Sequence, residues 1–182
     1  MKPQSTTREK GLQGLATQEF DWLIKRIQGV GFTPKYIVTW HYKMPCEYQN
    51  EQFMNRRKDV YAVELDTRHI KNVILSHFWG INRPDKARDL PTLIFFHERC
   101  KNLDQYHTHM LMSEIPAPFK LISEIEKDFN TVIKKKARSL SRMQRIDARE
   151  IYDYHGVVGY CLKRSIKSEY ALDVTNSTLI YP

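Results

Sequence analysis

The sequence contains few cysteines and no long hydrophobic run. The three cysteines, Cys46, Cys100 and Cys161, are widely spaced and form no C-x-x-C pair, which argues against a disulfide framework and for a reducing compartment. No apolar stretch is long enough to cross a bilayer, and the first residues are too polar for a signal peptide. These absences argue against a secreted scaffold and an integral membrane protein, and they predict a soluble protein of the cytoplasm.

Acidic residues are also scarce relative to basic ones. The chain has 29 lysines and arginines against 21 aspartates and glutamates, which gives a formal net charge of +8. Such an excess favours polyanionic partners, and phosphate backbones are the commonest large anions that a soluble protein meets. The charge therefore predicts a nucleic-acid partner. The motif G-x-x-x-x-G-K-[ST], which would indicate a helicase, is absent.

Hydrophobic periodicity predicts elements in the order α-β-α-β-β-α-β-α. We expect helices at 20–27, 51–78, 119–140 and 157–167, and strands at 36–42, 92–98, 106–112 and 144–151. The segment 60–65 also fits an extended conformation, and the two middle strands should pair as a hairpin. This order indicates an α+β fold, with a central antiparallel sheet flanked by helices. Residues 1–34 are expected to form a helical extension, and residues 35–182 a single globular domain.

Two histidines one residue apart carry the first chemical signal. On a strand, His107 and His109 point to one side while Thr108 points to the packed side. Glu98, near the end of the preceding strand, can supply a third ligand across the hairpin, and His97 must then point to the opposite face. A carboxylate beside two imidazoles suits Mg²⁺ or Mn²⁺.

A tyrosine on the last predicted helix carries the second signal. Tyr160 shares one helical face with basic residues, namely Lys163, Arg164 and Lys167, while Val158, Cys161, Leu162 and Ser165 form the opposite, packed face. Gly156 and Gly159 remove side-chain bulk beside the phenol, so that a phosphate can approach. Tyr152 and Tyr154 are expected to precede the helix and are therefore weaker candidates for the same role.

Each signal has a simpler alternative. The histidine pair also fits two half-exposed polar residues on a strand, and Cys100 could make it part of a zinc site. The tyrosine helix also fits a solvated basic face with an incidental tyrosine. These alternatives stay open when each motif is taken by itself.

Taken in order, the motifs resemble those of the HUH endonuclease superfamily, specifically the single-tyrosine rolling-circle replication initiators. The resemblance rests on the aromatic strand 36–40, a glutamate followed by H-x-H, and a later Y-x-x-K, and it covers residues 36 to 164. It implies a ferredoxin- or RRM-like sheet of about five strands with the HUH fold. It also implies the metal ligands Glu98, His107 and His109, the nucleophile Tyr160 and the motif lysine Lys163.

The function implied by this resemblance is the sequence-specific nicking and joining of single-stranded DNA through a 5′-phosphotyrosine intermediate, with Mg²⁺ or Mn²⁺. The DNA would be a single strand or an origin hairpin of a plasmid, phage or small virus, and a host or separate helicase would unwind it. The protein would work in the host cytoplasm, or in the nucleus for a eukaryotic virus.

The chain also departs from the family pattern. Thr108 stands between the histidines, where relatives usually carry a bulky hydrophobic residue. Gly156 and Arg164 occupy the positions where two-tyrosine relatives carry a second tyrosine. A transposase or a mobilisation relaxase is an alternative within the superfamily, although relaxases usually place the tyrosine before the histidines.

Two alternatives belong to other classes: a non-catalytic module that binds single-stranded nucleic acid, and a metal hydrolase of small phosphoesters. The repeated H-x-[ST] motif of two-histidine phosphoesterases is absent.

Contacts with DNA are expected from basic and aromatic residues. Aromatic side chains can stack on bases, although core packing is the alternative for those on a buried strand face; the candidates are Tyr36, Trp40, Tyr42 and Tyr106. The segment 134–145 has six basic residues and no acidic one, which suits a phosphate backbone, and a solvated helix end is the alternative. The candidates are Lys134, Lys135, Lys136, Arg138, Arg142, Arg164 and Lys167.

Overall fold

A computed structural model describes residues 25, 32–43, 56–99, 105–116, 121–136, 143–162 and 172–178. Lys25 is helical, as expected for the predicted helix at 20–27. The rest of that helix, and most of the predicted extension at 1–34, lies outside the described residues.

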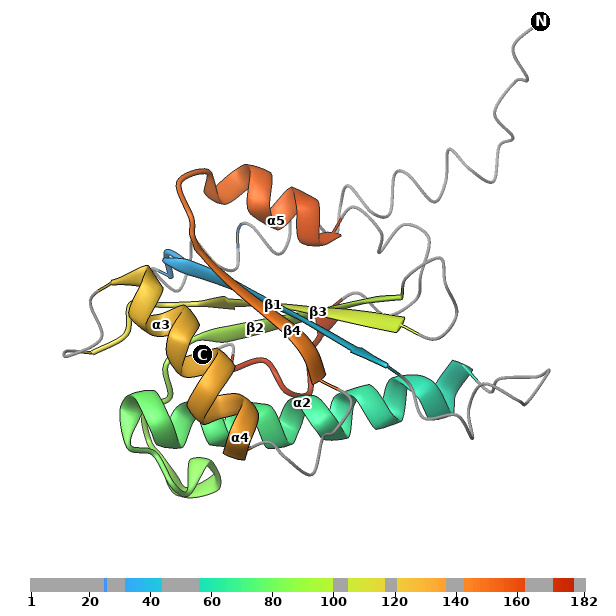
Figure 1. The fold of residues 1–182 in the computed structure, drawn as a ribbon, viewed down its shortest axis with the longest axis horizontal. Coiled ribbons are helices and arrows are strands. Elements are labelled where there is room, and N and C mark those ends of the chain that lie inside the picture. Colours follow the sequence, from blue (N-terminus) through green and yellow to red (C-terminus); the bar gives the residue numbers. More distant parts are fainter. Residues whose placement is uncertain are drawn as a thin grey trace, which may run out of the picture.

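An open antiparallel sheet forms the centre of the described chain (Figure 1). Its strands are β1 (Tyr36–Lys43), β2 (Leu93–Arg99), β3 (Gln105–Met112), β4 (Met143–Glu150) and β5 (Leu172–Asp173), in the spatial order β4-β1-β3-β2-β5. The first four strands were predicted, and β2 and β3 pair as an antiparallel hairpin, as expected. The short β5 was not predicted, because two residues are too few to show an alternating pattern. The α+β fold with a five-stranded antiparallel sheet is confirmed.

Helices cover both faces of the sheet (Figure 1). One face is covered by α2 (Arg56–Trp79) and by a continuous run of α3 (Ile122–Asp128), η3 (Phe129–Ile133) and α4 (Lys134–Lys136); the other is covered by α5 (Tyr154–Leu162). A short 3₁₀ turn, η2 (Pro84–Lys86), follows α2. The segment 60–65 lies inside α2, so the extended alternative for it is wrong. Among the described helices, none combines the length and the apolar character needed to cross a membrane.

Alternation along the strands divides the core into two clusters. Phe95 joins the larger cluster beneath α2 and α3, whereas its neighbour Phe96 joins the smaller one beneath α5. Trp40 packs edge-on against Phe95, with ring centroids 6.2 Å apart. Because Trp40 and Tyr36 are buried in the larger cluster, core packing accounts for both, and neither presents a stacking surface to bases. The side chains of Tyr42 and Tyr106 lie outside the described residues.

Helix α5 begins three residues earlier than expected. Asp153 accepts hydrogen bonds at this end: its side-chain Oδ1 from the Gly156 backbone N–H (3.0 Å), and its carbonyl from that of Val157 (3.0 Å). An aspartate at this position stabilises a helix start because it satisfies backbone donors that have no partner within the helix. Tyr154 therefore lies in the first turn of α5 rather than before it, which corrects the prediction.

Candidate active site

The polar end of one sheet face lies beneath α5. Antiparallel register places Glu98 of β2 opposite His107 of β3, and Thr39 of β1 opposite His109. Since these residues alternate with the buried residues of the opposite face, all four side chains share the α5 side. The structure thus brings the two predicted histidines and the predicted glutamate to one surface.

His109 is the most constrained member of this group. Its imidazole is 3% exposed, its Nε2 lies 3.5 Å from the Glu98 carboxylate, and its Nδ1 is hydrogen-bonded to the Thr39 hydroxyl at 2.9 Å. Burial lowers the pKa of His109 below its usual value, and this effect outweighs the opposing influence of Glu98. A neutral imidazole that donates Nδ1–H to Thr39 keeps a lone pair on Nε2, which is the form that binds a metal ion.

Thr39 and His41 were not among the predicted site residues. His41 is the cross-strand partner of His107, and their ring centroids are only 3.8 Å apart, whereas those of His107 and His109 are 6.4 Å apart. The strand pattern of 36–42 contained both residues, but only the pairing of β1 with β3 shows that they join the histidines.

Tyr160 lies over the same surface from α5. Its ring is 5.4 Å from the ring of His109 in an edge-to-face arrangement, and its side chain remains 55% exposed. The neighbouring Val158 and Cys161 are buried beneath the helix, as predicted. Burial, with a smaller effect of Glu98, raises the pKa of the Cys161 thiol to about 12, so this sulfur is protonated at neutral pH.

The other two tyrosines near α5 point to different surroundings. Tyr152 is 90% exposed and donates its hydroxyl to Glu150 at 3.1 Å. Tyr154 packs against the smaller core cluster, with its hydroxyl buried. Within the described residues, Tyr160 is therefore the tyrosine that combines exposure with a contact to the histidine pair.

The donor groups suit a divalent cation only in part. Among the described residues, the buried Nε2 of His109 has no hydrogen-bond partner, and the Glu98 carboxylate faces it at 3.5 Å. As the side chains stand, however, no three His, Cys, Asp or Glu residues of the described segments are grouped closely enough to hold a metal ion. Glu98 and His109 thus form two converging ligands, with His107 on the same face as a third donor. Cys100, the residue of the zinc alternative, lies outside the described segments.

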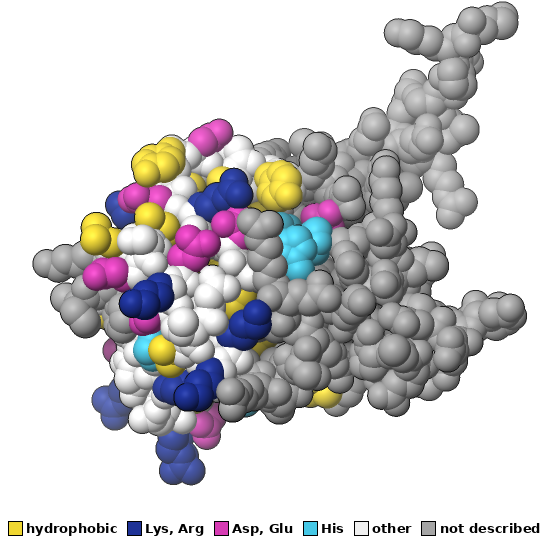
Figure 2. Space-filling view, in the orientation of Figure 1, with side chains coloured by type: hydrophobic (Ala, Val, Ile, Leu, Met, Phe, Trp, Pro, Cys, Tyr) yellow, Lys and Arg dark blue, Asp and Glu magenta, His cyan; other side chains and the backbone are white. Residues whose placement is uncertain are grey.

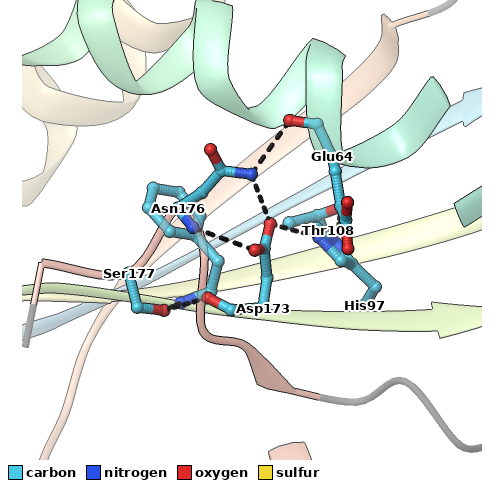
Figure 3. A network of polar contacts seen from close by, with 7 residues as sticks. Glu64, His97, Thr108, Asp173, Asn176 and Ser177 are labelled. Atoms are coloured by element: carbon cyan, nitrogen blue, oxygen red, sulfur yellow. Dashed lines mark hydrogen bonds and ion pairs between the residues drawn. The ribbon is translucent and has the colours of Figure 1, made fainter. Parts of the chain in front are cut away.

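His97 and Thr108 point to the opposite face, as predicted. Their side chains are buried and hydrogen-bonded to each other, with the His97 Nδ1 and the Thr108 Oγ1 3.0 Å apart (Figure 3). This contact accounts for a polar residue between the two site histidines, because the buried hydroxyl has a partner.

The described part of the predicted basic surface lies away from Tyr160. Lys134 is partly buried, and Lys135 and Lys136 are exposed; all three belong to α4, on the side of the sheet opposite α5. On the face drawn in Figure 2, basic and acidic side chains alternate over the described surface rather than forming one basic patch. Arg138, Arg142, Lys163, Arg164 and Lys167 lie outside the described segments, so their roles remain predictions.

Comparison with known protein families, curated proteins and solved structures gives no match. The site itself is therefore the basis for the proposed function.

Proposed function

We propose that this protein is a metal-dependent endonuclease that nicks and joins single-stranded DNA through a covalent tyrosine intermediate, as in the initiation of rolling-circle replication. The observation that carries the proposal is the convergence of Glu98, His107 and His109 from the β2–β3 hairpin with Tyr160 from α5. Glu98 and Tyr160, which are 62 positions apart along the chain, both lie next to His109 on one sheet face. A half-exposed tyrosine beside a buried imidazole–carboxylate pair suits a nucleophile next to a cation site.

The order of elements agrees with this proposal. The described chain runs β1-α2-β2-β3-α3-β4, and its four long strands lie in the order β4-β1-β3-β2. This order is similar to the split βαβ arrangement of ferredoxin-like folds, and it supports the fold that the resemblance to HUH endonucleases implies. The hairpin of β2 and β3 carries the proposed ligands; β3 is the central strand of the five-stranded sheet, and β2 lies between β3 and the short β5.

Glu98, His107 and His109 would hold Mg²⁺ or Mn²⁺, which when bound neutralises charge on the scissile phosphate. The donor set fits in part, since burial lowers the pKa of His109 and favours its neutral form, its Nδ1 is anchored by Thr39, and its Nε2 has no hydrogen-bond partner among the described residues. His107, whose ring packs against His41, would complete the set.

Tyr160 would attack the phosphorus of a single-stranded DNA backbone. A bond forms between its phenolic oxygen and phosphorus, and the bond from phosphorus to the 3′ oxygen breaks. The phenolic proton is lost to solvent, and the departing 3′ oxygen takes up a proton as it becomes a hydroxyl. Because the ester is conserved in the 5′-phosphotyrosine, a 3′-hydroxyl can attack it in reverse and restore the strand. The exposure of Tyr160 gives DNA access, and the contact with His109 orients its ring.

The first prediction concerns Tyr160 directly. A pool of random-sequence single-stranded DNA, labelled at the 3′ end and incubated with the full chain and Mn²⁺, should yield a labelled covalent adduct on a denaturing gel. Tyr160→Phe should reduce the yield below about a thousandth of wild type, because the nucleophilic oxygen is removed. Chelation of the metal should also abolish the adduct.

Tyr152→Phe is the matched control, because it removes the hydroxyl of a more exposed tyrosine eight residues away. It should form adduct at the wild-type level. DNA binding without any adduct would indicate a non-catalytic module, and multiple turnover without an adduct would indicate a phosphoesterase. An adduct that persists in Tyr160→Phe would reject Tyr160 as the nucleophile.

A further inference from the structure

A buried polar chain lies behind the two strands that carry the proposed ligands (Figure 3). His97 donates its Nε2–H to the Asp173 carboxylate at 2.9 Å, and its Nδ1 is hydrogen-bonded to the Thr108 hydroxyl at 3.0 Å. The three side chains come from β5, β2 and β3, and all are buried. A sheet interior normally holds apolar residues, so a polar chain of three members at this position requires an explanation.

The Asp173 end of this chain is firmly anchored. The side-chain amide of Asn176 donates to the Asp173 carboxylate (2.6 Å) and to the backbone carbonyl of Glu64 in α2 (2.9 Å), while its backbone N–H donates to the other carboxylate oxygen (2.9 Å). The Ser177 hydroxyl donates to the Asp173 carbonyl (2.6 Å) and accepts from the backbone N–H of Phe95 (3.0 Å). The segment 172–178 is thereby joined to both β2 and α2.

Burial distinguishes the three residues of this polar chain from a catalytic triad. An aspartate, a histidine and a hydroxyl in sequence are also the parts of a hydrolase triad. Thr108 is fully buried, however, and the side chains of His97 and Asp173 are 4% and 0% exposed. No substrate can reach the hydroxyl, so the chain acts through position rather than through nucleophilic attack.

The positions of His97 and Thr108 connect this buried polar chain to the residues of the proposed site. The two residues are cross-strand partners, and the adjacent pair in the register is Glu98 with His107. Because successive side chains on a strand point to opposite faces, fixing His97 toward the back also fixes the direction of Glu98. Fixing the side chain of Thr108 in the same way fixes the directions of the His107 and His109 side chains.

We propose that Asp173, His97 and Thr108 are positioning residues that hold Glu98, His107 and His109 in place from behind the sheet. The inference rests on the proposed function for the role of those three front-face residues. In this arrangement the segment 172–178, remote in sequence from the histidines, becomes part of the machinery of the site. Neither Asp173 nor His97 needs to touch DNA or metal to affect it.

The test compares two buried threonines. Thr108→Val removes the hydroxyl that contacts His97, whereas Thr67→Val removes a buried hydroxyl of α2 that has no hydrogen-bond partner in the described part of the chain. Two quantities are measured: the Kd for Mn²⁺, by titration followed with electron paramagnetic resonance, and the metal-free ¹⁵N resonances of the histidine rings. Thr108→Val should raise the Kd about tenfold, because substitution of residues that support metal ligands typically weakens metal affinity by this order. It should also shift the His107 and His109 resonances. Thr67→Val and Thr108→Ser should leave both the Kd for Mn²⁺ and the histidine resonances near their wild-type values.

Asp173→Asn provides a second variant, acting from the far end of the chain. It should shift the same His107 and His109 resonances although Asp173 lies on the opposite face of the sheet. If Thr108→Val and Asp173→Asn change thermal stability but leave these resonances and the Kd unchanged, the polar chain is only structural and the inference is wrong. If wild type neither binds Mn²⁺ nor forms adduct, the proposed function fails, while the ring resonances still decide whether the chain positions the histidines.

Discussion

His109 shows how burial and two neighbours can fix the state of a single side chain. Sheet packing buries it, Thr39 holds its Nδ1, and Glu98 faces its Nε2. Burial would be unfavourable for an imidazolium, and it therefore keeps the ring neutral. The residue thus combines a fixed orientation with the protonation state that a metal ligand requires.

A prediction at this scale concerns Thr39. Thr39→Val keeps the shape of the side chain but removes the partner of the His109 Nδ1, so the ring loses both its orientation and its preferred tautomer. We expect an approximately tenfold weaker affinity for Mn²⁺, measured by titration of the metal. Thr39→Ser keeps the hydroxyl and should retain most of the affinity; equal losses in both variants would show that the methyl group, not the hydrogen bond, matters.

At the scale of elements, the start of α5 determines which tyrosine faces the site. Asp153 caps the helix through Gly156, and the helix then exposes Tyr160 while burying Val158 and Cys161. A Cβ atom added to Gly156 would collide with the Asp153 carboxylate. The glycine is therefore explained by the cap itself, rather than by the approach of a phosphate that the sequence suggested.

This relation can be tested with a double-mutant cycle. Alanine in place of glycine ordinarily stabilises a helix by about 1 kcal/mol, but in this protein the new methyl group would displace the capping carboxylate. Gly156→Ala should therefore change the free energy of unfolding little in wild type, and increase it by about 1 kcal/mol in an Asp153→Ala background, as measured with urea. Equal stabilisation in both backgrounds would contradict the proposed conflict.

At the scale of the whole molecule, Asp173 links the last described segment to the sheet. Burial by itself would raise the pKa of this carboxyl group, but hydrogen bonds from His97 and Asn176 outweigh that effect and lower the pKa below its usual 3.8. A carboxylate whose pKa is lower in the folded state stabilises the fold above its unfolded pKa. That stability is lost as the pH falls through the folded pKa.

Asp173→Asn should therefore lower the free energy of unfolding most at neutral pH and least in acid, where the protonated carboxyl group of wild type resembles an amide. Removing one partner of a buried pair typically lowers the free energy of unfolding by about 3–5 kcal/mol, and we expect a loss of this order at pH 7. The difference in this free energy between variant and wild type should shrink as the pH falls from about 4 toward 2. Urea unfolding of both proteins across this range measures it. The neighbouring Glu64 has a pKa raised by burial and by the charge of Asp173, so its opposite effect belongs to higher pH. Asp173→Asn removes only the part of that effect that comes from Asp173. A difference that does not depend on pH would contradict the argument.

Local patterns were sufficient for much of this description. Alternation and helical spacing predicted β1 to β4 and α2, and strand geometry placed His107 and His109 on one face with Thr108 and His97 on the other. Tyr160 followed from helical spacing, because Val158 and Cys161 marked the buried side.

Features that depend on segments far apart in the chain needed the tertiary structure. Thr39 and His41 join the site only because β1 pairs with β3, and Asp173 meets His97 only because the segment 172–178 returns to the edge of β2. The packing of α4 on the side opposite α5 likewise separates the lysine run from Tyr160. The sequence by itself determined which side chains share a face of each element, because backbone periodicity is local. Only the tertiary structure decided which faces meet, because strand pairing and helix packing join residues that no local pattern relates.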